Sequence, residues 1–168
     1  MKVTEKQRNS KMCVICGMDN KYGVHAQFYN MEDGSVVSPF RFSECHQSYP
    51  GRVHGGMITA MLDEIGLRAI WTTEPGVWGV TMSLETKYRK PVPYNEDLFA
   101  VGKVVSSTHR FMQSAAYIYD AGGNLLAEAK LKYIKLLPEQ ITDSDYHEEM
   151  CYYNKDKIKE IPLNFIKK

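Results

Sequence analysis

A run of apolar residues between His54 and Thr72 fits one long helix that is hydrophobic around almost its whole circumference. It opens with a His-Gly-Gly turn and stops before Glu74-Pro75-Gly76, a combination that ends helices. Its apolar members are Met57, Ile58, Ala60, Met61, Leu62, Ile65, Leu67, Ala69, Ile70 and Trp71. A helix with so narrow a polar stripe must be covered on nearly all sides. A single sheet covers one side only, so a second copy of the chain is the economical candidate for the other.

Segments with the two-residue alternation of β-strands lie on both sides of this helix. They cover residues 25–30 and 36–43 before it, and residues 80–88, 98–105, 111–119 and 125–136 after it. The pattern predicts an α+β architecture in a single domain over residues 13–137, behind a flexible leader over residues 1–12. Residues 138–168 are expected to form a tail that is partly helical or irregular, with a short helix near 143–151.

Composition narrows the functional classes. The formal charge is +1 over 168 residues, which argues against a general nucleic-acid binder. The first residues are polar with no apolar run behind them, and no stretch approaches the roughly 18 apolar residues of a membrane span. We therefore expect a cytoplasmic protein that has neither a nucleic acid nor a membrane as a partner.

Four cysteines are too few for a disulfide scaffold in a chain of this length. Cys13 and Cys16 form a single CxxC motif, which is a weak zinc signal without a second one. A zinc site completed by Cys45 and His46 is chemically conceivable, since thiolate and imidazole both suit zinc. The interpretation we favour is an ordinary turn of reduced cysteines that holds no metal.

Charge enters the apolar helix at Asp63, Glu64 and Arg68, and a buried charge is costly unless it is paired. Glu64 and Arg68 are four residues apart in the favourable order, which predicts an ion pair between them. Asp63 has small or apolar neighbours on the helix and no cation. One interpretation is a functional carboxylate with a shifted pKa. An equally good interpretation is that Asp63 only makes a hydrogen bond to a loop or to a partner subunit.

The His-Gly-Gly turn lies where the helix begins. A helix N-terminus presents unpaired N–H groups and the positive end of a dipole, so it receives an oxygen that carries negative charge. Gly55 and Gly56 let a ligand approach the backbone closely, and the Gly55 N–H is well placed as an oxyanion donor. His54 either orients a substrate carbonyl or caps the turn. With a carboxylate further along the helix, the pattern indicates a site that handles carbonyl groups.

Three segments taken together resemble a known family: CVICGMDNKYGVHAQFY, HQSYPGRVHGGMITAMLDEIG and GVTMSLETKYRKPVP. Over residues 13–136 the chain is similar to the hotdog-fold acyl-CoA thioesterases of the phenylacetate-pathway type. The resemblance implies an antiparallel curved sheet around one central helix, with Asp63 as general base or nucleophile. It further implies that the Gly55 N–H binds the oxyanion, that His54 lies beside the thioester and that Thr81 positions water.

The resemblance also implies a homodimer, with a dimer of dimers left open. Asp63 and Thr81 would come from one chain, and His54 and Gly55 from its partner. Coenzyme A, as part of the substrate, would lie along Tyr88, Arg89, Lys90, Ser106, His109 and Arg110. Basic side chains suit its phosphates, although a solvated basic strand end explains any one of them as well. No separate cofactor is required.

One position departs from the family pattern, because several members carry Asn where this chain has Ser48 and Tyr49. In those members the amide helps to hold the attacking water or the thioester, so the residue that takes this role beside Asp63 is left open. We expect hydrolysis of an acyl-CoA to the free acid and CoA. The alternatives are a hotdog hydratase or dehydratase, and a non-catalytic acyl-CoA binding protein. A group of large apolar side chains suggests room for an aromatic or medium apolar acyl group, although core packing would explain the same residues equally well. They are Met57, Met61, Trp71, Trp78 and Met82.

Overall fold

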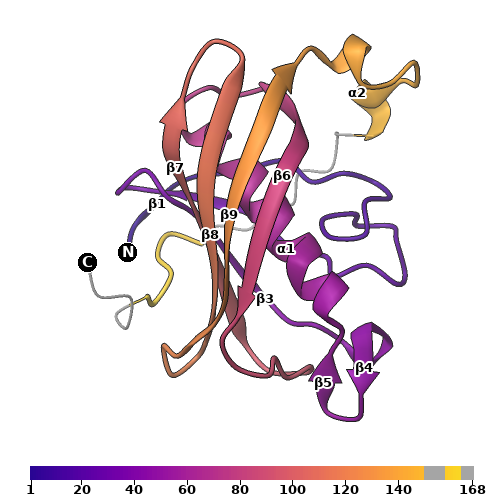
Figure 1. Ribbon diagram of the computed structural model, residues 1–168, viewed down its shortest axis with the longest axis vertical. Helices are drawn as coiled ribbons and strands as arrows, with labels where there is room; N and C mark the ends of the chain where they lie inside the picture. Colours follow the sequence, from indigo (N-terminus) through magenta and orange to yellow (C-terminus); the bar gives the residue numbers. More distant parts are fainter. Residues whose placement is uncertain (150–157, 164–168) are drawn as a thin grey trace.

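The computed structural model describes residues 1–149 and 158–163, and within them a curved antiparallel sheet of seven strands wraps one long helix (Figure 1). The sheet runs in the order β1-β2-β3-β7-β8-β9-β6. Its strands are β1 (Val3–Lys6), β2 (Tyr29–Met31), β3 (Val36–Phe40), β6 (Trp78–Tyr88), β7 (Leu98–Ser107), β8 (Phe111–Asp120) and β9 (Leu125–Leu136). The helix, α1 (Gly55–Arg68), continues into the 3-10 turn η2 (Ala69–Thr72). These elements confirm the expected α+β architecture.

Shorter elements lie before and after this unit. The 3-10 turn η1 (Glu44–His46) and a hairpin of β4 (Gln47–Tyr49) and β5 (Arg52–Val53) lead into α1. The 3-10 turn η3 (Pro138–Gln140) and the short helix α2 (Tyr146–Glu149) follow β9. Helix α2 falls inside the tail helix predicted near 143–151, whose last two residues lie outside the described part of the chain.

The helix approaches β7 unusually closely. A Cβ added to Gly102 of β7 would lie 2.3 Å from the backbone oxygen of Ile65. Such a distance is far below van der Waals contact, so only glycine lets the two backbones pack together here. The inward face of α1 contributes Ile58, Met61, Leu62 and Ile65 to the main hydrophobic core.

Residues 1–12 are not the flexible leader that their polar composition predicted. β1 pairs antiparallel with β2, and the N-terminal ammonium donates to the carbonyl of Ile161 at 2.9 Å. Gln7 is 5% exposed, and its side-chain Nε2 donates to Asn30 Oδ1 at 2.7 Å and to the carbonyl of Arg68 at 3.1 Å. The prediction was wrong because these polar groups are buried through hydrogen bonds, which hydropathy does not report.

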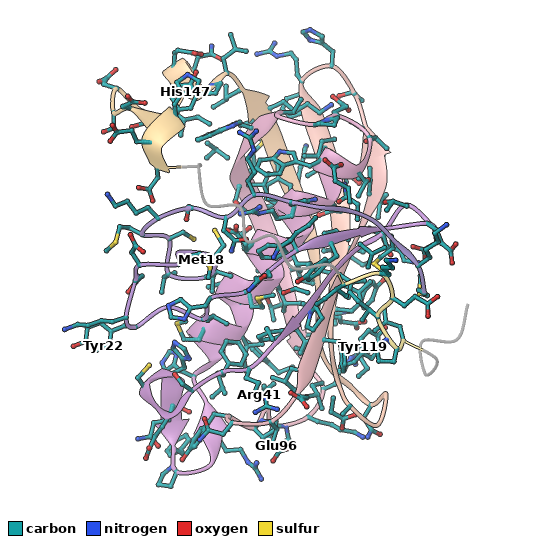
Figure 2. The ribbon with its side chains drawn as sticks, turned by 180° about the vertical axis from the view of Figure 1, so that it is seen from behind. Met18, Tyr22, Arg41, Glu96, Tyr119 and His147 are labelled. Carbon is teal, nitrogen blue, oxygen red and sulfur yellow. The ribbon has the colours of Figure 1, made fainter. Side chains whose placement is uncertain are left out.

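The side of α1 that faces away from the sheet is covered in part by this same N-terminal region. Figure 2, which views the molecule from behind, shows the segment that carries Met18 and Tyr22 beside the helix. Ile15, Val24 and Phe28 are buried in the core cluster that contains the helix residues. The N-terminal region therefore supplies part of the covering that the sequence assigned to a second copy of the chain, while Met57, Ala60 and Leu67 stay only partly buried.

Two predicted strands begin or end elsewhere. The strand expected at 25–30 is only Tyr29–Met31, because His25 has a φ of 56°, in the left-handed region that interrupts an extended strand. The strand expected at 36–43 ends at Phe40, where its partner Leu98 begins β7. The other four agree with the predicted ranges to within a few residues. No helix among the described residues has the length and apolar character needed to cross a membrane.

Candidate active site

Asp63 lies two-thirds of the way along α1, on the side that faces the edge strand β6. The hydroxyl of Thr81 on β6 donates to Asp63 Oδ1 at 2.9 Å. The Tyr133 hydroxyl on β9 lies 3.3 Å from the same oxygen and donates to the Asp63 backbone carbonyl at 2.9 Å. β6 contains a bulge between Thr81 and Ser83, and a bulge of this kind re-aims the side chains beside it. The structure thus brings the predicted pair Asp63 and Thr81 into direct contact.

The surroundings of Asp63 favour its neutral form. Burial raises the pKa of Asp63 above its ordinary value, while the Thr81 and Tyr133 hydroxyls oppose the rise and the charge of Glu64 adds to it. A carboxylate with a raised pKa is a stronger base than usual, and such groups are concentrated at functional sites.

Tyr133 is a site residue that the sequence did not reveal. Its side chain is fully buried, and burial together with the neighbouring Asp63 charge raises its pKa. It remains a protonated hydrogen-bond donor at physiological pH. The alternation of β9 indicates that Tyr133 faces inward, but nothing in the local sequence says that its hydroxyl ends at Asp63.

The start of α1 has the geometry of an anion site. His54 is the N-cap residue, and its Nδ1 accepts a hydrogen bond from the Gly56 N–H at 2.9 Å. Of the two roles considered for His54, capping the turn is therefore confirmed for its Nδ1 atom. Within the described chain no acceptor is found for the Gly55 N–H, the first of the helix, so it can donate to a ligand.

Tyr88 closes over this helix mouth. Its hydroxyl donates to the Gly55 carbonyl at 3.0 Å and lies 2.7 Å from the hydroxyl of Thr59. The Tyr88 ring is still 54% exposed, so it can form one wall of a ligand site beside the Gly55 N–H. Ser48 and Tyr49 lie on the exposed strand β4 nearby.

The helix mouth and Asp63 are too far apart to act together within one chain. Gly55 and Asp63 are separated by eight residues of α1, which corresponds to about 12 Å along the helix axis. An oxyanion donor and a general base must each lie within about 3 Å of their reacting atoms. One chain therefore presents two half-sites.

The residues expected to bind coenzyme A fall into two groups. Tyr88, Arg89 and Lys90 lie at the end of β6 next to the start of α1. At the other end of the sheet, Ser106 lies near the end of β7, and His109 and Arg110 lie in the β7–β8 turn (Figure 1). Across the intervening strand β9, Phe111 is in register with Val80, and Ile118 is in register with Tyr88. The two groups are therefore separated by the eight residue steps of β6 from Val80 to Tyr88, or roughly 26 Å. A single chain does not bring them together.

Neither basic residue in the first group is an isolated charge. Arg89 Nε donates to Glu128 Oε1 at 3.1 Å, and Lys90 Nζ donates to Asn124 Oδ1 at 3.0 Å. Both contacts are on the exposed surface, where such bonds are readily exchanged for others.

The predicted ion pair on α1 is confirmed. Arg68 Nε donates to Glu64 Oε1 at 2.9 Å. The guanidinium is buried, and it also stacks on the rings of Phe28 and Trp71, whose centroids lie 4.5 and 4.8 Å away.

Cys45 and His46 do not complete a site with Cys13 and Cys16. His46 Nε2 instead contacts the Tyr22 carbonyl at 2.9 Å, and Cys45 is exposed.

Two of the residues proposed for an acyl pocket line the same cavity. Trp71 and Trp78 border an open cavity of about 270 Å³ beside α1, together with Leu67. Met61 is fully buried in the core, and Met82 is 52% exposed on β6. The two tryptophans therefore stay candidates for contact with an acyl group.

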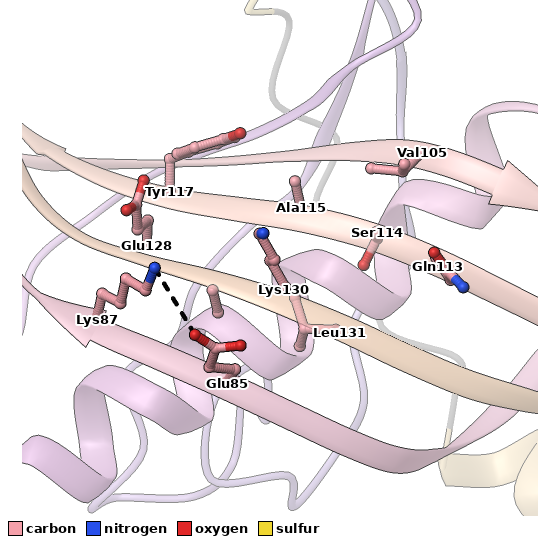
Figure 3. A pocket seen from close by; sticks show the side chains of 11 residues that line it. Glu85, Lys87, Val105, Gln113, Ser114, Ala115, Tyr117, Glu128, Lys130 and Leu131 are labelled. Atoms are coloured by element: carbon pink, nitrogen blue, oxygen red, sulfur yellow. Dashed lines mark ion pairs between the residues drawn. The ribbon is translucent and has the colours of Figure 1, made fainter.

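A second cavity, of about 410 Å³, lies over β6, β8 and β9 (Figure 3). Its charged lining includes Glu85 and Lys87, whose ion pair spans 3.7 Å, and Glu128 and Lys130. Figure 3 shows these side chains on the face of the strands opposite α1. Neither Asp63 nor the helix mouth borders it, so it is separate from the candidate active site.

The chain is similar in sequence and in fold to known proteins. The sequence profile of the thioesterase superfamily matches residues 50–127. Human acyl-coenzyme A thioesterase 13 is 26% identical over 98 residues, which are 58% of this chain and 70% of that protein. "Putative esterase SSO1253" of Saccharolobus solfataricus is 31% identical over 104 residues, 61% of this chain and 68% of that one. The crystal structure of protein RHA08564, a thioesterase superfamily protein, matches with a TM-score of 0.67 and 28% identity, over 73% of this chain and 63% of that chain.

One helix wrapped by a curved antiparallel sheet, with a polar site at the helix, defines the hotdog fold, as the resemblance implied. The chain belongs to the thioesterase superfamily.

Proposed function

We propose that this protein hydrolyses acyl-CoA thioesters to the free acid and CoA, as an enzyme of the phenylacetate-pathway type. The observation that supports the proposal most is the environment of Asp63. It is a carboxylate with a raised pKa, oriented by the hydroxyls of Thr81 and Tyr133. The name of the human relative, an acyl-coenzyme A thioesterase, supports the substrate class.

In the reaction the thioester carbonyl oxygen accepts a hydrogen bond from the Gly55 N–H at the positive end of α1, where the developing oxyanion is stabilised. Asp63 removes a proton from a water held beside Thr81, and the hydroxide adds to the carbonyl carbon. The tetrahedral intermediate collapses, the carbon–sulfur bond breaks, and the CoA thiolate receives the proton. Direct attack by Asp63 through an anhydride uses the same groups and is the alternative route.

The two half-sites make a homodimer part of this proposal. β6 is the outer strand of the sheet, eleven residues long, and it exposes the apolar side chains of Val80 and Met82. A long edge strand of this kind pairs readily with another chain. Antiparallel pairing of β6 with its own copy turns the Tyr88 end of one strand toward the Trp78 end of the other. It moves the helix mouth of one chain toward Asp63 of its partner.

The same pairing accounts for the separated CoA-binding candidates. It brings Tyr88, Arg89 and Lys90 of one chain toward Ser106, His109 and Arg110 of the other. The 3′,5′-ADP portion of CoA carries several negative charges, and guanidinium and ammonium groups from two chains suit it.

The first test is Asp63→Asn, measured by release of CoA thiol over short, medium and aryl acyl-CoAs. We expect a loss of activity on the order of 10²–10⁴-fold, the usual contribution of a general base. Unchanged turnover would exclude Asp63 as base or nucleophile. Hydration of an enoyl-CoA in place of thiol release would indicate a hydratase, and tight binding of CoA esters without turnover a binding protein.

Thermal unfolding of the same variant separates loss of function from loss of fold. Because the pKa of Asp63 is higher in the folded protein than in the unfolded chain, the protonated side chain stabilises the fold at low pH. This stabilisation is lost as the pH rises from the ordinary pKa of an aspartate to the folded-state pKa. Asn bears no charge, so the variant should melt no lower than the parent at neutral pH.

A further inference from the structure

Cys13, Cys16 and Glu64 form a cluster of metal-ligating side chains that the hydrolytic mechanism does not use. One donor atom from each, the two Sγ atoms and a carboxylate oxygen, lies within 4.8 Å of the others. In the part of the chain that the structure describes, this is the one such group of three or more Cys, His, Asp or Glu side chains. It joins the N-terminal CxxC motif to the residue of α1 that follows Asp63.

The turn that carries the two cysteines is shaped like a metal-binding knuckle. The Ile15 N–H points at Cys13 Sγ at 3.3 Å, and the Gly17 N–H donates to the Cys13 carbonyl at 2.8 Å. The Ile15 N–H aimed at sulfur favours the thiolate form of Cys13, the form that binds metal. A Cβ on Gly17 would lie 2.4 Å from the Cys13 carbonyl oxygen, so this tight turn requires glycine after the second cysteine.

The third donor is already held in place. Arg68 donates a hydrogen bond to the Oε1 atom of Glu64. The other carboxylate oxygen, Oε2, lies at a distance of 3.8 Å from Cys13 Sγ. Two ligands of a tetrahedral Zn²⁺ with a Zn–S bond of about 2.3 Å and a Zn–O bond of about 2.0 Å lie roughly 3.5 Å apart. The observed spacing needs little adjustment to accept the ion.

Arg68 supplies the outer layer of such a site. Its Nη2 donates to Cys16 Sγ at 3.1 Å while its Nε holds Glu64, so one guanidinium orients two of the three donors. Two thiolates, one carboxylate, Zn²⁺ and the guanidinium sum to zero charge, which suits a buried position. The cavity beside α1 is lined by all three donors and gives water access to a fourth coordination position.

We propose that Cys13, Cys16 and Glu64 bind one Zn²⁺ ion, with water as the fourth ligand, and that the ion fastens the N-terminal segment to α1. Thiolate and carboxylate ligands with an accessible fourth position suit zinc. The ligand set differs from the one that the sequence made conceivable, because Glu64 takes the place of Cys45 and His46.

The test is the zinc content of the full chain, purified under reducing conditions and measured by elemental analysis. We expect one equivalent per chain in the parent and in Cys45→Ser, whose thiol is exposed and outside the cluster. Cys13→Ser and Cys16→Ser should lose it. Cobalt substitution should give a thiolate-to-metal charge-transfer band in the parent, and chelation should lower its melting temperature.

Glu64→Gln covers the case in which a cysteine variant fails to fold, because it keeps both thiols and an oxygen that can accept from Arg68. Its zinc affinity should fall at least about 10–100-fold in competition with a chromophoric chelator, with the circular dichroism spectrum unchanged. Less than a tenth of an equivalent of zinc in the reduced parent, with no uptake from added zinc, would overturn the proposal. If a mild disulfide reagent then joined Cys13 to Cys16, the pair would be redox-active instead.

Discussion

At the scale of single residues, the chemistry depends on how Asp63 is kept available as a base. Its Oδ1 accepts a hydrogen bond from the Thr81 hydroxyl and lies 3.3 Å from the Tyr133 hydroxyl, while burial disfavours its charged form. These hydroxyls hold the pKa of Asp63 below the value that burial alone would give. The base is therefore tuned by two opposing effects, desolvation and hydrogen bonding.

Tyr133→Phe should move the acid limb of the activity profile to higher pH. Removing the hydroxyl takes away one of the two hydrogen bonds that lower the Asp63 pKa, so the carboxylate becomes ionised only at higher pH. The pH dependence of kcat/KM measures this shift. Tyr117→Phe is the matched control and should leave the profile unchanged, because Tyr117 lines the second cavity, which neither Asp63 nor the helix mouth borders. A profile unaltered in Tyr133→Phe would mean that Asp63 does not set the acid limb.

Gly55→Pro should remove the oxyanion donor with little effect on the helix. Proline is well accepted at the first helical position, where its missing N–H has no partner within the helix. His54 has φ and ψ of −63° and 134°, a conformation that a residue before proline adopts. We expect kcat to fall on the order of 10²–10³-fold.

Gly55→Ala provides the control for this substitution, since it adds a Cβ and keeps the N–H. The added carbon would meet the movable Tyr88 hydroxyl at 3.3 Å. Alanine and proline variants that lose equal activity would argue against the N–H as the reason.

At the scale of helices and strands, sequence patterns predicted the interior of the molecule better than its borders. The helix and the four strands after it follow clear periodicities, and they lie where the sequence placed them. β1 escaped notice because its residues are mostly polar and its pairing with β2 depends on contacts distant in sequence. The hairpin β4–β5 is too short to show a period. Contacts such as Tyr133 to Asp63 link residues 70 positions apart, which no local pattern encodes.

Gly102→Ala should be the most damaging small change at the helix–sheet contact. The new Cβ would meet the Ile65 carbonyl oxygen, and a backbone atom in a packed helix cannot move aside cheaply. We expect a loss of about 1–3 kcal/mol in the free energy of unfolding, measured by urea denaturation.

Gly122→Ala, in the β8–β9 turn, is the control and should change stability by less than about 0.5 kcal/mol. Its nearest contact for an added Cβ is the movable carboxylate of Asp120 at 3.3 Å. Equal stability of the two variants would show that α1 and β7 are not tightly packed in solution.

At the scale of the whole molecule, the two half-sites set the requirement for assembly. The sequence suggested a dimer from the apolar circumference of α1, and the chain covers part of that helix with its own N-terminal region. The separation of about 12 Å between Gly55 and Asp63 is the stronger reason for a second chain. Hybrid dimers test this requirement because each chain can be inactivated in a different half-site.

The decisive measurement is the specific activity of hybrids made by co-expressing two differently tagged chains and purifying through both tags. A hybrid of Asp63→Asn with Gly55→Pro keeps one intact site only if sites are shared between chains, and it should then show about half the parent activity. A hybrid of the parent chain with a chain that carries both substitutions should be inactive. The reverse result, an inactive first hybrid and a half-active second one, would contradict a site shared between two chains.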